Sequence, residues 1–474
     1  MSPLLFNVFI NDLESYLSLH HPESRVKVGE KPLSSLLFAD DVVLLANSKD
    51  DLQLLIDRLC AYSKCWGLEI NTDKTVTMVF QRSGKNKTSD NFICNGNVLA
   101  NVNSFSYLGI VFSSSGTFSV AASNLADKGK KVAHMLIRKK NCDRDISLLP
   151  ETQLYLFETY VKQVLLYGCE MWSTASSFNR ISALSDPHVQ NIVNFKPANK
   201  VMIDFCKFIL GLGKKSSNSA VLAELGIYPL DIEIKVRIIK YWLRVMSLSD
   251  DHILKHSYNN ALELDSRGHR SWATAVRFIL QNNGMGNIWL KLNQPENSSV
   301  DGSRVLTNLE KRLQDQYQQL FFAKIQDHKV KHGSDTKLRF YRLFKNSYSA
   351  EKYLSSVPSF KMRQIFSKFR ISNHKLRIET GRYSQEKVSE RTCQFCPSSV
   401  TEDEFHLLFT CNLYDDIRET LFSSISNTFP TFSSKTDKAR AQFLMSVQNP
   451  NLLYCVASFL LECFARRDNL LLLT

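Results

Sequence analysis

The sequence predicts an α+β fold in which a mixed N-terminal segment precedes a largely helical remainder. Residues 36–45 form an apolar run interrupted by Asp40 and Asp41, which predicts two half-buried strands that meet at a turn. Residues 50–66 carry apolar side chains at the spacing of one helix face. After residue 115 the pattern turns helical, most clearly over residues 154–167.

Further elements follow along the chain. Residues 105–112 predict the strands that close the N-terminal segment, and residues 232–246 and 305–322 predict helices. Gly168 is suited to end the helix over 154–167, because helices often finish at a glycine. Polar stretches that contain glycine or proline predict loops or linkers at residues 83–91, 173–198 and 284–303.

The composition indicates a globular chain with a polyanionic partner. Of its 474 residues, 44% are hydrophobic and 22% are charged, which is enough for roughly two to four domains. The formal net charge is +13, and residues 321–400 alone hold 17 Lys or Arg against 6 Asp or Glu. Such an excess of positive charge favours binding to RNA or single-stranded DNA.

Aromatic residues interleave with this basic stretch, as in residues 339–345 and 361–370. Phosphate neutralisation combined with base stacking is the usual physics of single-strand binding. The same pattern also fits basic helices whose aromatic side chains face the core, in which case the lysines and arginines alone form a cationic surface.

The cysteines indicate a reducing compartment. Most of the eleven cysteines are solitary and lie in apolar surroundings, which is typical of core thiols and not of a secreted disulfide framework. We expect no signal peptide, and the apolar run at 452–464 is too short to span a bilayer. We therefore expect an intracellular protein, in the nucleus or cytoplasm, without membrane contact.

Asp40 and Asp41 form the first candidate metal site. Adjacent carboxylates repel each other, and apolar neighbours make each one costlier to ionise. A divalent cation removes both penalties, and hard oxygen ligands suit Mg²⁺. The alternative is an ordinary solvated Asp-Asp turn.

Cys393, Cys396, His406 and Cys411 form the second candidate metal site. They are separated by two, nine and four residues, which is the pattern of a small Cys-Cys-His-Cys zinc knuckle. Four protein ligands would give a closed, structural Zn²⁺ site. His406 and Cys411 reach one ion if a helix ends near Cys411. The alternative is three core thiols and a core histidine.

Four ordered segments carry a family resemblance: residues 2–13, 38–41, 67–75 and 105–110. Taken together, they resemble the palm of reverse transcriptases of non-LTR retrotransposons. The first is similar to the helix that follows a Pro-Leu-Ser-Pro motif, and the second to the aromatic-x-Asp-Asp turn that binds metal. The third is similar to a segment whose lysine acts on the leaving pyrophosphate, and the fourth to the primer grip.

The resemblance implies an RNA-directed DNA polymerase with an RNA template and a DNA primer or target. Asp40 would be the main ligand bridging two Mg²⁺ or Mn²⁺ ions, and Asp41 a more peripheral one. Lys74 would stabilise or protonate the leaving pyrophosphate. The alternative is a solvated lysine in a loop that connects strands.

The resemblance also implies nucleic-acid contacts. The primer grip would contribute Phe105, Tyr107, Leu108 and Gly109, and a thumb helix would contribute Lys130, Lys131 and Arg138. The alternative for the thumb residues is an ordinary basic face exposed to solvent.

The resemblance extends to the C-terminus, where residues 378–383 and 402–406 are similar to the Cys-Cys-His-Cys region of such proteins, which helps to bind nucleic acid. It implies five parts: a partial palm (1–115), a helical thumb (116–250), a helical basic linker region (251–385), a zinc-knuckle-like region (386–430) and C-terminal helices (431–474).

One departure from the family is expected to matter. In the family, a further metal-binding aspartate lies on a strand before the first matching helix, together with the fingers. Because that helix has already begun at Met1, we expect the chain alone to be unable to polymerise DNA. The alternatives are a non-catalytic RNA- or DNA-binding remnant that uses the C-terminal half, and a relic without function.

Overall fold

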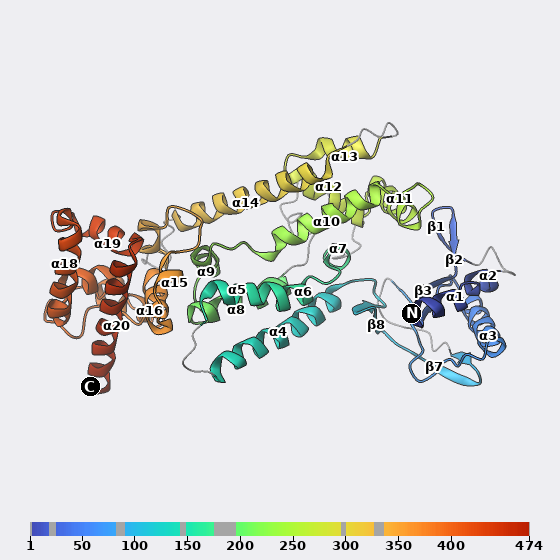
Figure 1. The fold of residues 1–474 in the computed structure, drawn as a ribbon, viewed down its shortest axis with the longest axis horizontal. Helices are drawn as coiled ribbons and strands as arrows, with labels where there is room; N and C mark the ends of the chain where they lie inside the picture. The colour runs from blue at the N-terminus through green and yellow to red at the C-terminus, as the bar shows by residue number, and fades with distance from the viewer. Residues whose placement is uncertain are drawn as a thin grey trace. The chain divides into compact units, whose positions relative to one another are not determined.

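The structure is a computed structural model that describes residues 2–18, 25–81, 91–142, 148–174, 196–294, 300–326 and 336–473. Figure 1 shows the course of the chain. The chain divides into two compact units. Unit 1 comprises Met1–Asn124, Gly168–Phe195 and Ile234–Leu309, and unit 2 comprises Leu125–Tyr167, Lys196–Glu233 and Glu310–Thr474. Short strands precede a helix-rich remainder, which confirms the predicted α+β class.

The described strands lie in unit 1 and form four small sheets. Three of these are hairpins: β1 (Val26–Val28) with β2 (Lys31–Leu33), β3 (Ser35–Phe38) with β4 (Asp41–Leu44), and β8 (Ser104–Tyr107) with β9 (Ile110–Ser113). In the fourth sheet β7 (Asn97–Asn101) lies between β6 (Phe92–Cys94), which is antiparallel to it, and β5 (Val76–Thr77), which is parallel.

Unit 1 also contains helices. They are α1 (Ser2–Phe9), α2 (Leu13–Ser18), α3 (Lys49–Cys65), α7 (Cys169–Trp172), α11 (Ile253–Ser266), α12 (Trp272–Asn282), α13 (Gly286–Leu292) and most of α10 (Leu230–Met246). Helix α3 begins at Ser48, whose hydroxyl accepts a hydrogen bond from the Asp51 amide at 3.2 Å, as is usual for an N-cap. The predicted helices over 50–66 and 232–246 are thus α3 and α10.

Two apolar clusters support the strand that begins at Asp41. Leu13, Leu17 and Tyr62 form one cluster, and the other joins α3 to the β6–β7 hairpin. Leu44 of β4 packs against both clusters. The Tyr62 hydroxyl donates to Asp12 at 2.6 Å, and burial together with this bond raises the pKa of Tyr62 to about 12. The hairpin therefore has a firm apolar base.

The helices α10 to α13 make a separate aromatic core in unit 1. Trp242 of α10 stacks on Trp289 of α13, with 5.7 Å between ring centroids. Residues 284–303 were predicted to be a linker, but α13 lies within them, because Trp289 is buried. The Trp272 indole donates to the backbone oxygen of Glu170 at 2.8 Å and thereby ties α7 to α12.

Two other predicted loops lie largely outside the described residues. These are the loops at 83–91 and 173–198. In the part of the chain that the structure describes, no helix combines the length and the apolar character needed to cross a membrane.

Unit 2 is helical in its described part. It contains α5 (Pro150–Leu156), α6 (Lys162–Leu165), α8 (Lys196–Leu210), α9 (Asn218–Leu225), α15 (Tyr353–Ser356), α16 (Phe360–Arg370), α17 (Arg377–Thr380), α18 (Asp415–Thr428), α19 (Asp437–Ser446), α20 (Pro450–Leu473) and most of α4 (Ser119–Cys142) and α14 (Gly302–Gln326). Short π- and 3₁₀-helices connect them: η1 (Phe157–Val161), η3 (Tyr341–Leu343), η4 (Val388–Glu390), η5 (His406–Thr410), η6 (Asn412–Tyr414) and η7 (Pro430–Phe432).

The predicted helix over 154–167 is the continuous run α5–η1–α6, which ends at Leu165, and Gly168 follows in the left-handed region with a φ of 63°. The helix predicted at 305–322 is α14.

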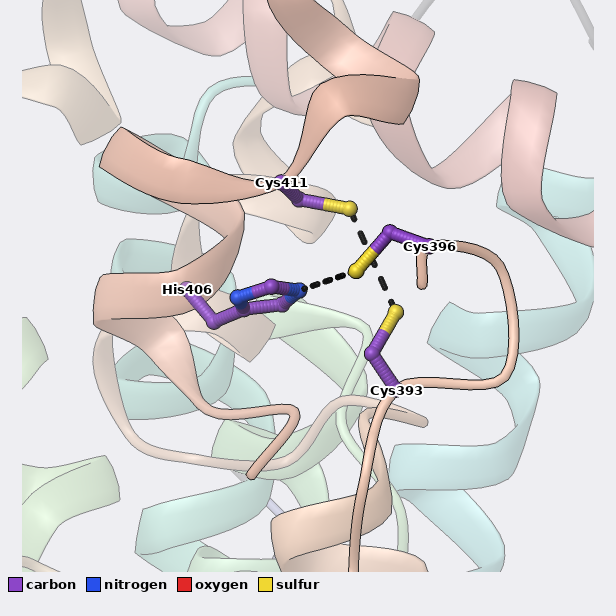
Figure 2. Close-up of side chains that lie close together, drawn as sticks. All are labelled: Cys393, Cys396, His406 and Cys411. Carbon is purple, nitrogen blue, oxygen red and sulfur yellow. Dashed lines mark hydrogen bonds between the residues drawn. The ribbon is translucent and has the colours of Figure 1, made fainter. Parts of the chain in front are cut away.

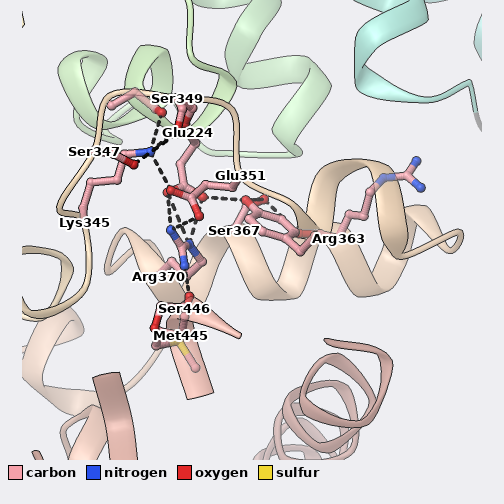
Figure 3. Close-up of polar contacts among 12 residues, drawn as sticks. Glu224, Lys345, Ser347, Ser349, Glu351, Arg363, Ser367, Arg370, Met445 and Ser446 are labelled. Atoms are coloured by element: carbon pink, nitrogen blue, oxygen red, sulfur yellow. Dashed lines mark hydrogen bonds and ion pairs between the residues drawn. The ribbon is translucent and has the colours of Figure 1, made fainter. Parts of the chain in front are cut away.

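A buried ion-pair network holds α9 against α16 in unit 2 (Figure 3). The Arg370 guanidinium binds Glu224 through several hydrogen bonds and also contacts Glu351 at 2.9 Å. Lys345 donates to the backbone oxygen of Ala223 at 2.8 Å. Burial alone would raise the pKa of Glu224, but the positive charges of Arg370 and Lys345 more than offset it, and the pKa lies below its usual value.

We expect Glu224→Gln to destabilise the chain by about 3 to 5 kcal/mol, because it leaves the Arg370 guanidinium buried without its main counter-charge. Glu351→Gln is the comparison variant: it removes the partly exposed ion-pair partner of Lys345 and leaves the Glu224–Arg370 pair intact, so we expect a smaller loss. Urea unfolding followed by circular dichroism measures both changes. Equal losses for the two variants would contradict the central role of Glu224.

Candidate functional site

The first candidate site is the turn between β3 and β4. Phe38 pairs with Asp41, so Ala39 and Asp40 alone make the connection. Ala39 has a φ of 51°, a left-handed conformation that costs a residue with a Cβ some strain. Both aspartate side chains are exposed at the tip of the hairpin. The turn thus directs two neighbouring carboxylates into solvent.

This hairpin is fixed at its other end by a carboxylate. The Ser35 hydroxyl, at the start of β3, donates to Glu14 of α2, and the Ser34 amide donates to the same side chain at 3.4 Å. Glu14 and Asp12 therefore have structural partners within the N-terminal segment. Among the described residues, no group of three or more metal-ligating side chains includes Asp40 or Asp41.

The β8–β9 hairpin lies beside the aspartate turn. Burial raises the pKa of Tyr107, and the negative charge of Asp41 raises it further, so the phenol is within electrostatic reach of that carboxylate. Leu108 and Gly109 both have positive φ, 48° and 82°, as a two-residue turn of this twist requires. Phe105 and Leu108 are exposed and Tyr107 is half-buried. The structure thus brings together two segments that the sequence places far apart.

The predicted lysines occupy exposed positions. Lys74 lies in a turn whose backbone bonds return to Asn71, immediately before β5. Its side chain is exposed, as are those of Lys130 and Lys131 on α4. The side chain of Arg138 lies outside the described residues, although its backbone belongs to α4.

Gly168 packs directly on the β8–β9 hairpin, a contact that sequence reasoning missed. Its φ is 63°, and a Cβ atom built on it would lie 3.1 Å from Cδ1 of Ile110 in β9. Gly168 had been interpreted only as a helix end. A side chain at this position would therefore have to displace the end of Ile110 by a few tenths of an ångström, so the contact with β9 also favours a glycine.

The second candidate site is a cluster of four side chains in unit 2 (Figure 2). The ligand atoms of Cys393, Cys396, His406 and Cys411 all lie within 4.8 Å of one another. The Sγ atoms of Cys393 and Cys411 are 4.0 Å apart, and Nε2 of His406 is 3.4 Å from Sγ of Cys396. A tetrahedral zinc site with ordinary bond lengths has about 3.8 Å between sulfur atoms and about 3.6 Å between sulfur and nitrogen. The donor set therefore fits such an ion.

Local backbone structure brings the four side chains together. An isolated bridge pairs Thr392 with Thr401, and the Cys393 amide donates to the Val400 oxygen at 2.9 Å, which folds the cysteine loop back on itself. Residues His406–Thr410 form the π-helix η5, and the Cys411 amide donates to the His406 oxygen at 2.9 Å. This wider turn brings a histidine and a cysteine five residues apart to the same point.

Neighbouring groups fix the ligands. Nδ1 of His406 is 2.9 Å from the Thr410 hydroxyl, which leaves Nε2 facing the cysteines. The hydrogen bond between the thiols lowers the pKa of Cys393 to about 3 although burial opposes it, and the same bond raises the pKa of Cys411. The surroundings of Cys393 thus favour its thiolate form, which is the form that binds a metal ion.

Two carboxylates between the ligands anchor this loop to the rest of unit 2. Glu402 accepts from Arg467 of α20 at 2.9 and 3.0 Å. Glu404 accepts from Arg339 at 2.7 Å and from Ser372 at 2.8 Å. The Arg467 guanidinium also lies over the ring of Phe395, 5.1 Å from its centroid. The loop is therefore built into a helical core.

These pairs decide between the two interpretations of the basic stretch. Arg370 is buried and Arg339 is largely shielded from solvent. The aromatic side chains of the stretch are buried as well, as the second interpretation expects: Phe340, Tyr341, Phe344, Phe366 and Phe369. They are therefore not available for stacking on bases. The cationic surface that this interpretation also expects is wrong for Lys345, Arg363 and Arg370, because these side chains are buried too.

Comparisons with known proteins show what the chain is similar to. Residues 1–112 match the family described as reverse transcriptase (RNA-dependent DNA polymerase). The chain is 27% identical over 176 residues to the Pol polyprotein of the type-1 retrotransposable element R2 of Popillia japonica, which covers 36% of this chain and 27% of that protein. It is 26% identical over 203 residues to the RNA-directed DNA polymerase of the mobile element jockey of Drosophila melanogaster, which covers 40% of this chain and 21% of that protein. A third relative, an R2 polyprotein of Nasonia vitripennis, is 33% identical over 129 residues, 25% of this chain and 12% of that protein. The chain thus spans about a quarter, or less, of the length of these relatives.

We expect Gly168→Ala to cost more stability than Gly67→Ala. Both glycines have nearly the same φ, 63° and 64°, so both variants bear the left-handed penalty of about 1 to 2 kcal/mol. Only Gly168 adds the close contact with Ile110, since nothing lies within 4 Å of a Cβ on Gly67. Urea unfolding followed by tryptophan fluorescence compares them, and equal losses would contradict the tight packing on β9.

Proposed function

Because residues 1–112 belong to the reverse transcriptase family, and the relatives are RNA-directed DNA polymerases of non-LTR retrotransposons, we propose that the chain supplies palm and thumb segments of such a polymerase. Asp40 and Asp41 bind Mg²⁺ or Mn²⁺ and act on a DNA primer paired with an RNA template. The observation that carries this proposal is the exposed Asp40–Asp41 turn, which lies within the residues that match the family.

The two aspartates suit this task physically. Their oxygens are hard ligands, they carry two adjacent negative charges, and they are open to solvent. When bound, the cations activate the primer hydroxyl and stabilise charge on the leaving phosphates. Asp40 takes the more central position and Asp41 the more peripheral one. Lys74, on its exposed turn, supplies positive charge to the triphosphate.

The Asp40–Asp41 pair by itself is an incomplete metal site. A pair of hard cations takes six or more oxygen ligands per ion, and no third protein ligand joins the pair among the described residues. Substrate phosphates and water supply part of the remainder. We therefore propose that this chain is inactive as a polymerase unless a further carboxylate, which the described residues do not supply, joins the two aspartates.

Metal affinity tests the aspartate site. We expect Asp40→Asn to weaken Mn²⁺ binding by roughly tenfold or more, since a charged ligand is lost. Asp50→Asn is the matched control, because Asp50 and Asp51 are also adjacent carboxylates, and Asp50 is exposed at the start of α3. Electron paramagnetic resonance of Mn²⁺ with a primed RNA template and nucleotide present measures both. Equal weakening by the two substitutions would contradict the assignment.

Primer extension tests the inactivity. We expect no template-dependent extension by the isolated chain. Extension that Asp40→Asn abolishes would contradict the proposed inactivity while supporting the metal site.

The alternative function is a non-catalytic RNA- or DNA-binding protein that uses the C-terminal half, favoured by the net charge of +13. Salt-sensitive RNA binding with unchanged Mn²⁺ affinity in Asp40→Asn would favour it.

For the C-terminal region we propose a structural Zn²⁺ site held by Cys393, Cys396, His406 and Cys411. The support is the fit of the two measured separations to a tetrahedral ion, together with the His406–Thr410 contact that orients the ring. Four protein ligands leave no open position for a substrate, so the ion would stabilise the loop and would not catalyse a reaction.

We expect one zinc per chain in metal analysis of the full-length protein, lost on Cys393→Ser. Cys455→Ser, in the half-buried part of α20, is the control and retains the metal. A chelator should lower the melting temperature of the wild type but not that of Cys393→Ser, because binding energy contributes to folding. Retention of zinc by Cys393→Ser would contradict the ligand set.

A further inference from the structure

Two buried cysteines of unit 1 face each other outside both candidate sites. The Sγ atoms of Cys60 and Cys94 are 3.0 Å apart, about 1 Å longer than a disulfide bond. Both are free thiols, and both are buried. We propose that Cys60 and Cys94 form a reversible disulfide under mild oxidation, which cross-links α3 to β6. This inference concerns the thiols of the N-terminal core and does not rest on the polymerase function.

A second contact holds the two elements in the required alignment. The Gln53 side chain of α3 donates to the backbone oxygen of Ile93 at 2.8 Å and accepts from its amide at 2.9 Å. Gln53 lies two turns before Cys60, on the same helix face, and Ile93 precedes Cys94. This paired amide contact prevents sliding of β6 along α3, so the two sulfur atoms remain neighbours.

The β6–β7 hairpin adds to this rigidity. Asn95 and Gly96 have φ values of 49° and 83°, the conformation of a tight two-residue turn immediately after Cys94. Ile56, Phe92 and Leu99 enclose the two sulfur atoms in one apolar cluster. Bond formation therefore needs only a small approach of two atoms that are already in contact.

The reaction proceeds by thiol–disulfide exchange with a low-molecular-weight disulfide such as oxidised glutathione. Because both thiols are buried, the exchange takes place when local opening of the β6–β7 hairpin exposes one of them. One of the two thiols loses its proton, and the thiolate attacks a glutathione sulfur and expels one glutathione thiolate. The second thiol then loses its proton and attacks the mixed disulfide, which releases the other glutathione. The two thiols lose two protons and two electrons, and glutathione disulfide becomes two molecules of glutathione. Because burial raises the pKa of Cys94 to about 12, the reaction is slow at neutral pH and faster in alkali.

The cross-link would restrain the surroundings of the Asp40–Asp41 turn. It closes the segment from residue 60 to residue 94, which carries the turn of Lys74 and β5. Leu44, at the end of the strand that begins at Asp41, packs against the same apolar cluster. Oxidation would therefore stiffen the base on which the aspartate turn stands, and reducing thiols would release it.

Peptide mapping of the full-length chain tests the proposal. The protein is incubated with oxidised glutathione, its free thiols are blocked, and it is digested with trypsin without reduction. Trypsin separates the relevant cysteines, because Cys60 lies in peptide 59–64, Cys65 in 65–74 and Cys94 in 88–128. We expect a linked pair of 59–64 with 88–128 that disappears with dithiothreitol. Pairing of 59–64 with 65–74, or glutathione adducts alone, would overturn the proposal.

Two variants provide matched controls. Cys65→Ser removes the exposed thiol of α3 and should retain the 59–64 to 88–128 pair. Cys60→Ser should lose it. The oxidised wild type should melt several degrees above its reduced form, because the bond constrains the unfolded chain, and Cys60→Ser should show no such difference. The peptide map of the wild type decides the question even if Cys60→Ser fails to fold, and an unchanged melting temperature in a fully cross-linked sample would contradict the stiffening.

Discussion

Pairing of charges withdrawn from water is the interaction on which the described part of unit 2 depends. Arg370 with Glu224, Arg467 with Glu402, and Arg339 with Glu404 each join segments far apart in the sequence. Removing one member of such a pair leaves an uncompensated charge in the interior, which costs far more than the loss of a surface contact. The helices and loops of unit 2 are thus held together by buried ion pairs in which neither partner can be removed at little cost.

The aspartate turn of unit 1 represents the opposite case. Asp40 and Asp41 are adjacent, alike in charge and open to solvent. Their strand is anchored through Leu44, and Glu14 holds the far end of the hairpin. Among the described residues, no ion pair is formed by either aspartate, so the turn contributes no charge pairing to the fold, and the two carboxylates are open to a cation, as we propose above. The contrast between the two units supports a functional interpretation of the turn.

Local patterns in the sequence predicted much of the fold, and contacts between distant residues largely escaped them. The apolar run around Asp40 predicted its hairpin, and helical spacing predicted α3, α10 and α14. The expected half-burial is wrong for β3, where Leu36, Leu37 and Phe38 are exposed. The Asn95–Gly96 dipeptide is a strong hairpin signal that could have revealed β6 and β7. Positive φ at Ala39 and Leu108 leaves no trace in residue type.

For the sites, spacing alone predicted the Cys-Cys-His-Cys cluster, because its ligands lie within one short stretch. The partners of Glu402 and Glu404 lie 25 to 65 residues away, and the Glu224–Arg370 pair spans 146 residues. A single sequence contains no signal for such pairs. The interpretation of the basic, aromatic stretch (residues 339–345 and 361–370) as a nucleic-acid-binding surface failed for the same reason, since its composition does not reveal which of its charges pair with acidic residues in the interior.

The position of Arg467 over Phe395 has a practical consequence. Fragments designed around the cysteine motif would ordinarily omit the last helix, α20, as an appendage. Such a fragment would lack Arg467, the counter-ion of Glu402, and the ring of Phe395 would lose its cover. The fragment would then expose a charged and aromatic surface that the intact chain does not. Affinities measured on such a minimal peptide would then describe the excision and not the protein.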